Sequence, residues 1–197
     1  MFKGFESGMV SRNGCDVFYR RRGQGPAVLL LHGFPQTHAM WAKIAAKLAQ
    51  DYTVICADLR GYGASGKPNG VAQYSFREMG ADQLYLMATM GFEHFDLVGH
   101  DRGGRTAYRM ALDAPERIRS LTVMDIVPTH LLLDDLNKDV ARTYYHWFFL
   151  AQPSPFPENM ILSDPDVFFQ NCLTSWGLTD LAHYAPEQLN AYSASWR

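Results

Sequence analysis

The stretch GHDRGG, residues 99–104, places a carboxylate, Asp101, at the centre of a pattern that usually carries serine. Small residues on both sides of the central position are typical of a nucleophile elbow, a sharp strand-to-helix turn. Such a turn presents the central side chain at the edge of a sheet and at a helix N-terminus, which favours an anion. Serine there would transfer an acyl group, whereas a carboxylate would attack an sp3 carbon and form an ester. Asp101 could instead serve only as the N-cap of the following helix.

Two arginines accompany this carboxylate, Arg102 directly after it and Arg105 one helical turn further on. Guanidinium groups bind carboxylates through paired N–H donors, and a spacing of three residues puts both arginines at the same end of the helix. Their positive charge is also expected to lower the pKa of Asp101. The pattern therefore predicts a substrate that carries a carboxylate of its own.

Two further stretches end expected strands with glycine-rich turns. HGFPQ, residues 32–36, is either a plain Gly–Pro turn or a loop whose Phe34 backbone N–H stabilises an oxyanion. DLRGYGAS, residues 58–65, is expected to be structural, with its glycines allowing backbone turns that a Cβ would forbid.

The elements that must position these residues alternate between strand and helix. Hydrophobic runs predict strands over residues 17–20, 28–31, 52–59, 95–101 and 118–128, and helical spacing predicts helices over 38–50, 76–90 and 105–116. This alternation predicts an α/β fold with a parallel core sheet. After Pro128 the pattern predicts helices over 134–150, 165–176 and 186–197, with a proline-rich loop over 151–160. We expect a core over residues 1–128 and an all-helical cap over 129–197.

The composition excludes several classes of protein. With 47% hydrophobic residues, 19% charged residues and a net charge of −2, the chain lacks the basic surface of a nucleic-acid-binding protein. Its three cysteines have neither metal-ligand nor redox-motif spacing, and no metal or organic cofactor is expected. The N-terminus lacks the apolar segment of a signal peptide, and the longest apolar run, residues 27–31, is too short to cross a membrane. These features predict a cytoplasmic protein.

The three motifs in this order resemble those of the α/β-hydrolase superfamily, and the aspartate elbow resembles its dehalogenase and epoxide-hydrolase branch. GHDRGGR, followed by MDIVPT and YYHWFFLAQP, is similar to the haloacetate dehalogenases, including those that cleave fluoroacetate. The resemblance implies an α/β-hydrolase fold with a mostly parallel sheet and a helical cap. It also implies roles for individual residues: Asp101 as nucleophile, Asp125 as the acid that orients a catalytic histidine, the N–H groups of Phe34 and Arg102 as oxyanion hole, Arg102 and Arg105 as carboxylate ligands, and His146 and Trp147 as halide ligands. Trp176 is a further candidate for the pocket.

Each of these roles has a structural alternative. An aromatic helix containing His146 and Trp147 could simply pack in a core, although their N–H groups are donors suited to a halide. Trp176 could equally be a packing residue, and Asp125 could be a strand-end turn residue. The sequence is compatible with either role for each of these residues.

The histidine that would activate water is not evident. The chain has histidines at 32, 38, 94, 100, 130, 146 and 183, and only His183 follows the aromatic helix, in sequence that resembles the cap. By resemblance the base follows the last strand of the sheet, together with another halide-binding tyrosine, so we expect the C-terminal core segment to be absent. A chain without that base would form the ester and fail to hydrolyse it.

The sequence thus predicts a hydrolytic dehalogenase that converts a short 2-haloacid into a 2-hydroxyacid and halide, with impaired turnover in this chain. The resemblance implies a homodimer, and no nucleic acid or membrane partner is expected. One alternative is an epoxide hydrolase, in which Tyr144 and Tyr145 would protonate the epoxide oxygen, but a neutral epoxide would leave Arg102 and Arg105 unpaired. The other alternative is a non-catalytic, truncated relative that binds small carboxylates.

Overall fold

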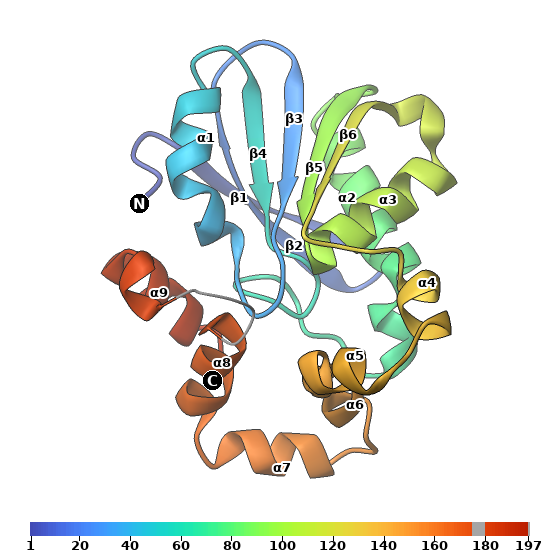
Figure 1. Ribbon diagram of the computed structural model, residues 1–197. Helices are drawn as coiled ribbons and strands as arrows, with labels where there is room; N and C mark the ends of the chain where they lie inside the picture. The colour runs from blue at the N-terminus through green and yellow to red at the C-terminus, as the bar shows by residue number, and fades with distance from the viewer. Residues whose placement is uncertain (175–179, 197) are drawn as a thin grey trace. The chain divides into compact units, whose positions relative to one another are not determined.

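The computed structural model describes residues 1–174 and 180–196, which form two compact units, Met1–Ile126 and Val127–Arg197. The first unit contains a six-stranded sheet in the order β1-β2-β4-β3-β5-β6 (Figure 1). Its strands are β1 (Glu6–Arg12), β2 (Cys15–Arg22), β3 (Ala27–Leu31), β4 (Thr53–Ala57), β5 (Phe95–His100) and β6 (Ile118–Met124). Strands β3, β4, β5 and β6 run parallel, whereas β1 and β2 pair antiparallel with each other and with β4. The α/β fold with a mostly parallel sheet is confirmed.

Strand β1 is the element of the sheet that the sequence did not predict. Its residues, ESGMVSR, contain little apolar surface, so hydrophobic patterning alone passes over them. The strand is instead specified by a tight hairpin, in which Asn13 and Gly14 both adopt positive φ between β1 and β2. An Asn-Gly pair is a strong hairpin signal, and it was available in the sequence.

Apolar residues cover both faces of the sheet. Successive residues of a strand point to opposite faces, so Leu29 and Leu31 of β3 belong to one buried cluster while Val28 and Leu30 belong to another. The first cluster includes residues of α2 (Phe76–Thr89) and α3 (Arg102–Asp113), and the second includes residues around α1 (Ala42–Leu48). Burial on both faces explains the continuous apolar runs of β3 and β4.

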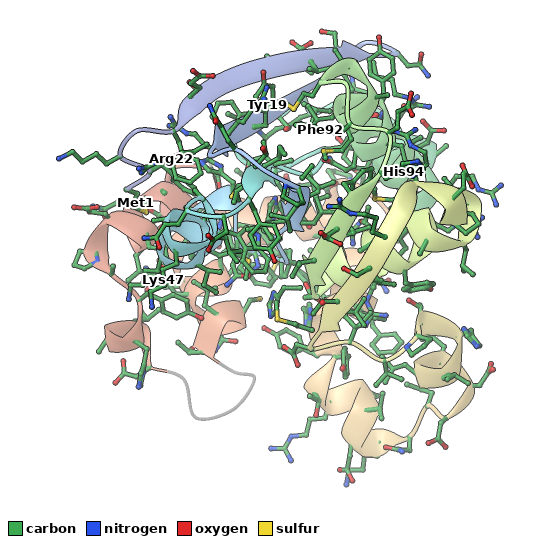
Figure 2. All side chains as sticks on the ribbon, turned by 90° about the horizontal axis from the view of Figure 1, so that it is seen from above. Met1, Tyr19, Arg22, Lys47, Phe92 and His94 are labelled. Atoms are coloured by element: carbon green, nitrogen blue, oxygen red, sulfur yellow. The ribbon has the colours of Figure 1, made fainter. Side chains whose placement is uncertain are left out.

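Partly buried side chains pack against the first cluster, and Figure 2 shows two of them, Tyr19 and Phe92, from above. Tyr19 of β2 and Phe92, which lies between α2 and β5, pack against this cluster. Three short 3-10 helices complete the unit: η1 (His38–Trp41), η2 (Val71–Tyr74) and η3 (Pro115–Arg117). The predicted helix over residues 38–50 is therefore two elements, η1 followed by α1.

Helices are the only regular structure among the described residues of the second unit. They are α4 (Thr129–Asp134), α5 (Lys138–Thr143), α6 (Tyr145–Leu150), α7 (Phe156–Leu162), α8 (Pro165–Thr174), η4 (Leu181–His183) and α9 (Pro186–Ser193). The region predicted to be helical over 134–150 contains two helices, α5 and α6, and the Asn137 side chain caps α5 by accepting the N–H groups of Asp139 and Val140. The loop predicted over 151–160 is wrong, because Pro157 lies in the first turn of α7, where proline is tolerated.

Candidate active site

Asp101 sits at the turn between β5 and α3, with φ 46° and ψ −115°. Non-glycine residues seldom adopt positive φ, and such residues cluster at functional sites. The turn needs glycine around it, since a side chain at Gly99 would collide with the backbone of Gly103, and one at Gly103 with the carbonyl oxygen of Leu31. The Asp101 side chain makes no capping hydrogen bond to α3. The alternative reading of Asp101 as an N-cap side chain is therefore wrong, and the turn has the geometry of a nucleophile elbow.

The carboxylate of Asp101 is held by the loop that follows β3. The backbone N–H of Phe34 donates to Oδ2 of Asp101 at 2.8 Å. This contact is possible because residue 33 is glycine: a Cβ there would lie 2.7 Å from His100 Nδ1 and 3.0 Å from Asp101 Oδ2. No hydrogen bond to the other oxygen, Oδ1, is found within residues 1–174 and 180–196. The structure thus brings Phe34 and Asp101 into contact, and the role of Phe34 in an oxyanion hole stays a prediction.

Arg102 and Arg105 both lie on α3, the helix that leaves the elbow. Arg102 is its first residue, and its guanidinium carbon lies 5.2 Å from the centroid of the Phe76 ring. Its Nε is buried and donates to no acceptor in the described part of the chain. Arg105 is 2% exposed. Their shared role as ligands of a substrate carboxylate stays a prediction.

Tyr62 is a residue of this site that the sequence analysis assigned only to a structural loop. Its ring packs edge-on against His32, with 5.2 Å between the centroids. Burial raises the pKa of Tyr62; the positive charge of Arg102 opposes this and the negative charge of Asp101 adds to it. The charges of Arg102 and Asp101 therefore both influence the phenol of Tyr62. An aromatic residue between two glycines at the carboxyl end of a central strand was the signal that could have identified it.

The DLRGYGAS loop containing Tyr62 is held by the buried carboxylate of Asp58. That carboxylate accepts hydrogen bonds from the backbone N–H of His38 at 2.7 Å, from His38 Nδ1 at 2.9 Å and from the backbone N–H of Ala64 at 3.0 Å. Burial alone would raise the pKa of Asp58, but the hydrogen bonds and charge of His38, together with His32, hold this pKa below its usual value. Ser65 donates to the carbonyl oxygen of Asp58 and accepts from the N–H of Phe18. These contacts match the structural role expected for the loop.

His32 connects this loop to the HGFPQ loop. The imidazole is fully buried, with Nδ1 2.9 Å from the carbonyl oxygen of Gly33 and Nε2 accepting the N–H of Leu59 at 3.0 Å. This arrangement requires the neutral ring that carries its proton on Nδ1. Burial lowers the pKa of His32, against the opposing charge of Asp58. The neutral ring therefore positions Gly33, the residue that precedes the donor to Asp101.

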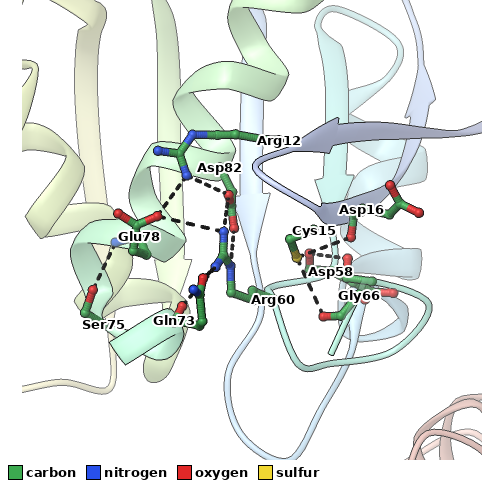
Figure 3. Close-up of polar contacts among 11 residues, drawn as sticks. Arg12, Cys15, Asp16, Asp58, Arg60, Gly66, Gln73, Ser75, Glu78 and Asp82 are labelled. Atoms are coloured by element: carbon green, nitrogen blue, oxygen red, sulfur yellow. Dashed lines mark hydrogen bonds and ion pairs between the residues drawn. The ribbon is translucent and has the colours of Figure 1, made fainter. Parts of the chain in front are cut away.

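A network of ion pairs connects the DLRGYGAS loop to α2 (Figure 3). Arg60 donates from Nε and Nη2 to both carboxylate oxygens of Asp82, at 2.8 and 2.7 Å, and from Nη1 to Gln73. Arg12, at the end of β1, reaches Asp82 at 3.1 Å and Glu78 at 3.0 Å. The network therefore ties the β1–β2 hairpin, the DLRGYGAS loop and α2 together.

Asp125 follows β6, with φ 56° and a side chain that is 73% exposed. Its Oδ2 lies 3.6 Å from Nε2 of His100, a contact that becomes an ion pair only when the ring is protonated. The structure thus shows a histidine facing Asp125, but it is the residue before the nucleophile. The predicted role of Asp125 in orienting a catalytic histidine stays a prediction.

The remaining predicted site residues belong to the second unit. His146 and Trp147 lie on α6, where the His146 ring packs against Tyr144 and Tyr145 and the Trp147 ring against Tyr144. Their binding of halide stays a prediction, and Trp176 lies outside the described residues. In the part of the chain that the structure describes, no group of three or more His, Cys, Asp or Glu side chains could hold a metal ion.

These features define a class of protein: a mostly parallel sheet, a nucleophile elbow after β5 and a donor loop after β3. Residues 26–197 match the family described as the alpha/beta hydrolase fold. The chain belongs to this family.

Particular relatives refine the comparison. The chain is 54% identical to a fluoroacetate dehalogenase of Burkholderia sp, over 100% of its own length and 66% of that protein. It is 31% identical to a soluble epoxide hydrolase of Corynebacterium sp., over 83% of this chain and 57% of that protein. The chain therefore spans about two thirds or less of the length of these relatives.

Solved structures give the same picture. A candidate alpha/beta hydrolase from Nostoc sp PCC 7120 is 43% identical, with a TM-score of 0.96 over 100% of this chain and 68% of that one. A mutant of a candidate epoxide hydrolase from Pseudomonas aeruginosa, with bound MFA, is 41% identical, with a TM-score of 0.93 over 98% of this chain and 65% of that one. Among the described helices, none is long and apolar enough to span a membrane.

Proposed function

We propose that this chain carries the nucleophilic half of a hydrolytic dehalogenase that acts on short 2-haloacids, haloacetates above all. The observation that carries the proposal is the Asp101 carboxylate in the elbow, held through Oδ2 by the N–H of Phe34 at 2.8 Å and followed directly by Arg102. The identity of 54% to a fluoroacetate dehalogenase supports the same reaction class.

In the first step, Oδ1 of Asp101 attacks carbon 2 of the haloacid from the side opposite the halogen. The new C–O bond forms as the carbon–halogen bond breaks, and halide leaves with the bonding electron pair, so the carbon is inverted. The substrate carboxylate would be held by the guanidinium groups of Arg102 and Arg105. His146 and Trp147 would donate N–H groups to the departing halide.

In the second step, water attacks the carboxyl carbon of the Asp101 ester. The proton of this water passes to a general base, and the oxyanion that forms on Oδ2 keeps the hydrogen bond from Phe34, with the N–H of Arg102 as second donor. Collapse of this intermediate releases the 2-hydroxyacid and restores the carboxylate. Asp125 would orient the histidine that acts as base.

We propose that the two steps separate in the 197-residue polypeptide, which would accumulate the Asp101 ester with slow or absent turnover. Incubation with chloroacetate, followed by mass spectrometry of the peptide containing Asp101, measures the first step, and halide released beyond one equivalent measures the second. The Asp101→Asn variant is the matched control, because it replaces a carboxylate oxygen by an amide nitrogen of similar size. An undiminished adduct in this variant would mean that another side chain is the nucleophile.

An epoxide hydrolase is the second candidate, supported by the likeness to the Corynebacterium and Pseudomonas aeruginosa proteins. Tyr144 and Tyr145 would then protonate the epoxide oxygen. Against it stands the guanidinium of Arg102, since a neutral epoxide offers that cation no negative charge. Comparing Asp101 ester formation from chloroacetate and from styrene oxide separates the two. A non-catalytic carboxylate-binding protein would bind haloacetate and form neither ester.

A further inference from the structure

Arg102 differs in its partners from the arginines of the first unit that form ion pairs with carboxylates. Those are Arg12, Arg60, Arg77, Arg109 and Arg119. For Arg102, the described residues offer no carboxylate within ion-pair distance, and the guanidinium instead lies over the ring of Phe76, 5.2 Å from its centroid. Its buried Nε donates to none of the described acceptors. A buried donor without an acceptor costs free energy, so the arrangement calls for a ligand that accepts.

Phe76 is the first residue of α2, so the start of this helix sets the position of its backbone. The side chain of Ser75 caps this helix by accepting the N–H of Glu78 at 3.2 Å. Helix α2 also packs closely on α3, since a Cβ at Gly80 would lie 2.9 Å from Cγ of Met110. Because α3 begins with Arg102 and α2 begins with Phe76, the packing of α2 on α3 brings the Phe76 ring next to the Arg102 guanidinium.

We propose that Phe76 is a positioning residue that holds the guanidinium of Arg102 by its ring face and keeps the N–H donors available for a substrate carboxylate. An aromatic face attracts a cation without occupying its hydrogen-bond donors. A carboxylate partner would have neutralised the charge and taken those donors. The pair thus favours an anionic substrate over a neutral one of the same shape, and in this respect the inference rests on the proposed function.

Tyr62 supports the placement. The charges of Arg102 and Asp101 both act on its phenol, with opposite effects on the pKa of Tyr62. An anion seated on Arg102 would therefore be near the carboxylate that attacks it. In a 2-haloacid the carboxylate is bonded directly to the reacting carbon. Arg102 could therefore bind the carboxylate while Asp101 attacks the neighbouring carbon.

The test compares Phe76→Leu, which removes the ring, with Phe76→Tyr, which keeps it. Phe92→Leu is the matched control, because Phe92 also carries an arginine over its ring, Arg21 at 5.4 Å, in a different part of the unit. Two measurements are made on the full chain. The first is acetate titration followed by the NMR signal of the Arg102 Nε–H, with acetamide as the neutral control. The second is the concentration dependence of Asp101 alkylation by chloroacetate, which gives a half-saturation concentration and a limiting rate.

Phe76→Leu should raise the dissociation constant for acetate and the half-saturation concentration for chloroacetate by about 2- to 30-fold, the range of one cation–π contact. The limiting alkylation rate should change less than about twofold, because the lost contact weakens substrate binding and leaves the chemical step unchanged. Phe76→Tyr and Phe92→Leu should behave like the parent. If Phe76→Leu does not fold, Phe76→Met provides the ring-free variant.

The results separate this inference from the proposed function. Acetate binding that depends on the ring, without any Asp101 ester in the parent, would support the inference and refute the dehalogenase. Ester formation with unchanged half-saturation in Phe76→Leu would overturn the inference and leave the dehalogenase standing. A parent chain whose Arg102 signal does not respond to acetate would also overturn it, as would an equal loss in Phe92→Leu.

Discussion

Replacing Gly33 with alanine tests whether the hydrogen bond from Phe34 to Asp101 matters for reactivity. The new Cβ would lie 2.7 Å from His100 Nδ1, 2.7 Å from Asp101 Cβ and 3.0 Å from Asp101 Oδ2, so one of these groups must move by several tenths of an ångström. Movement of the Asp101 side chain lengthens the 2.8 Å contact between the Phe34 N–H and Oδ2. Gly33 has no positive φ, so the effect is one of contact and not of backbone conformation.

Gly33→Ala should reduce both the reaction rate and the unfolding free energy. Removing one donor of an oxyanion hole costs about 10²- to 10³-fold in rate, so we expect ester hydrolysis to fall by about that factor wherever turnover is measured. Overpacking costs about 1–3 kcal/mol of unfolding free energy, which a folded domain of this size should survive. We also expect alkylation of Asp101 by chloroacetate to slow, since the carboxylate is no longer held in place.

The assay is the rate of Asp101 ester formation, followed by mass spectrometry, together with a urea unfolding curve. Gly14→Ala is the matched control, because nothing lies within 4 Å of its added Cβ and only its positive φ penalises the change, by about 1–2 kcal/mol. This control should lose stability without slowing alkylation. A Gly33→Ala protein that folds and reacts at the parent's rate would refute the argument from the donor loop.

Two further predictions concern the structure around the site. Asp82→Asn should lower the unfolding free energy by about 3–5 kcal/mol, because it removes the carboxylate closest to buried Arg60 and leaves only Glu78, at 3.9 Å, among the described carboxylates. Asp113→Asn, in a partly exposed pair, should cost less than about 1 kcal/mol in the same urea titration. Unfolding free energy should also fall as pH drops from about 7 towards 5, because the folded pKa of His32 lies below its ordinary value of 6.5 and the unfolded chain takes up the proton first. The slope from this group is at most about 1.4 kcal/mol per pH unit, and His32→Gln should remove it; an unchanged slope would mean that another group is responsible.

Local sequence was sufficient for the elements whose signals are themselves local. Buried five-residue strands, the periodicity of α2 and the glycine spacing around Asp101 are each properties of short stretches, and the structure contains them with bounds shifted by a few residues. The errors arose where a local signal was weak or was read too simply. Strand β1 has little apolar surface, and the proline-rich stretch over 151–160 was predicted to be a loop although α7 begins within it at Phe156.

The residue types also predicted the candidate chemistry. A carboxylate at Asp101 with Arg102 beside it indicates attack on an anionic substrate before any contact is known. What the sequence could not determine is which groups touch these two. The roles of Asp125, Arg105 and the aromatic residues of the second unit stay predictions for the same reason, since each depends on partners distant in the chain.

Only the tertiary structure decided that Oδ2 of Asp101 accepts the N–H of Phe34 and that the guanidinium of Arg102 lies over the ring of Phe76. The physical reason is the order of the strands. Strand β3 lies between β4 and β5, so the loops after three strands that are far apart in the sequence meet at one edge of the sheet. The sequence by itself determined the candidate nucleophile, a carboxylate at the elbow, and the packing of β3, β4, β5 and α2 determined its surroundings.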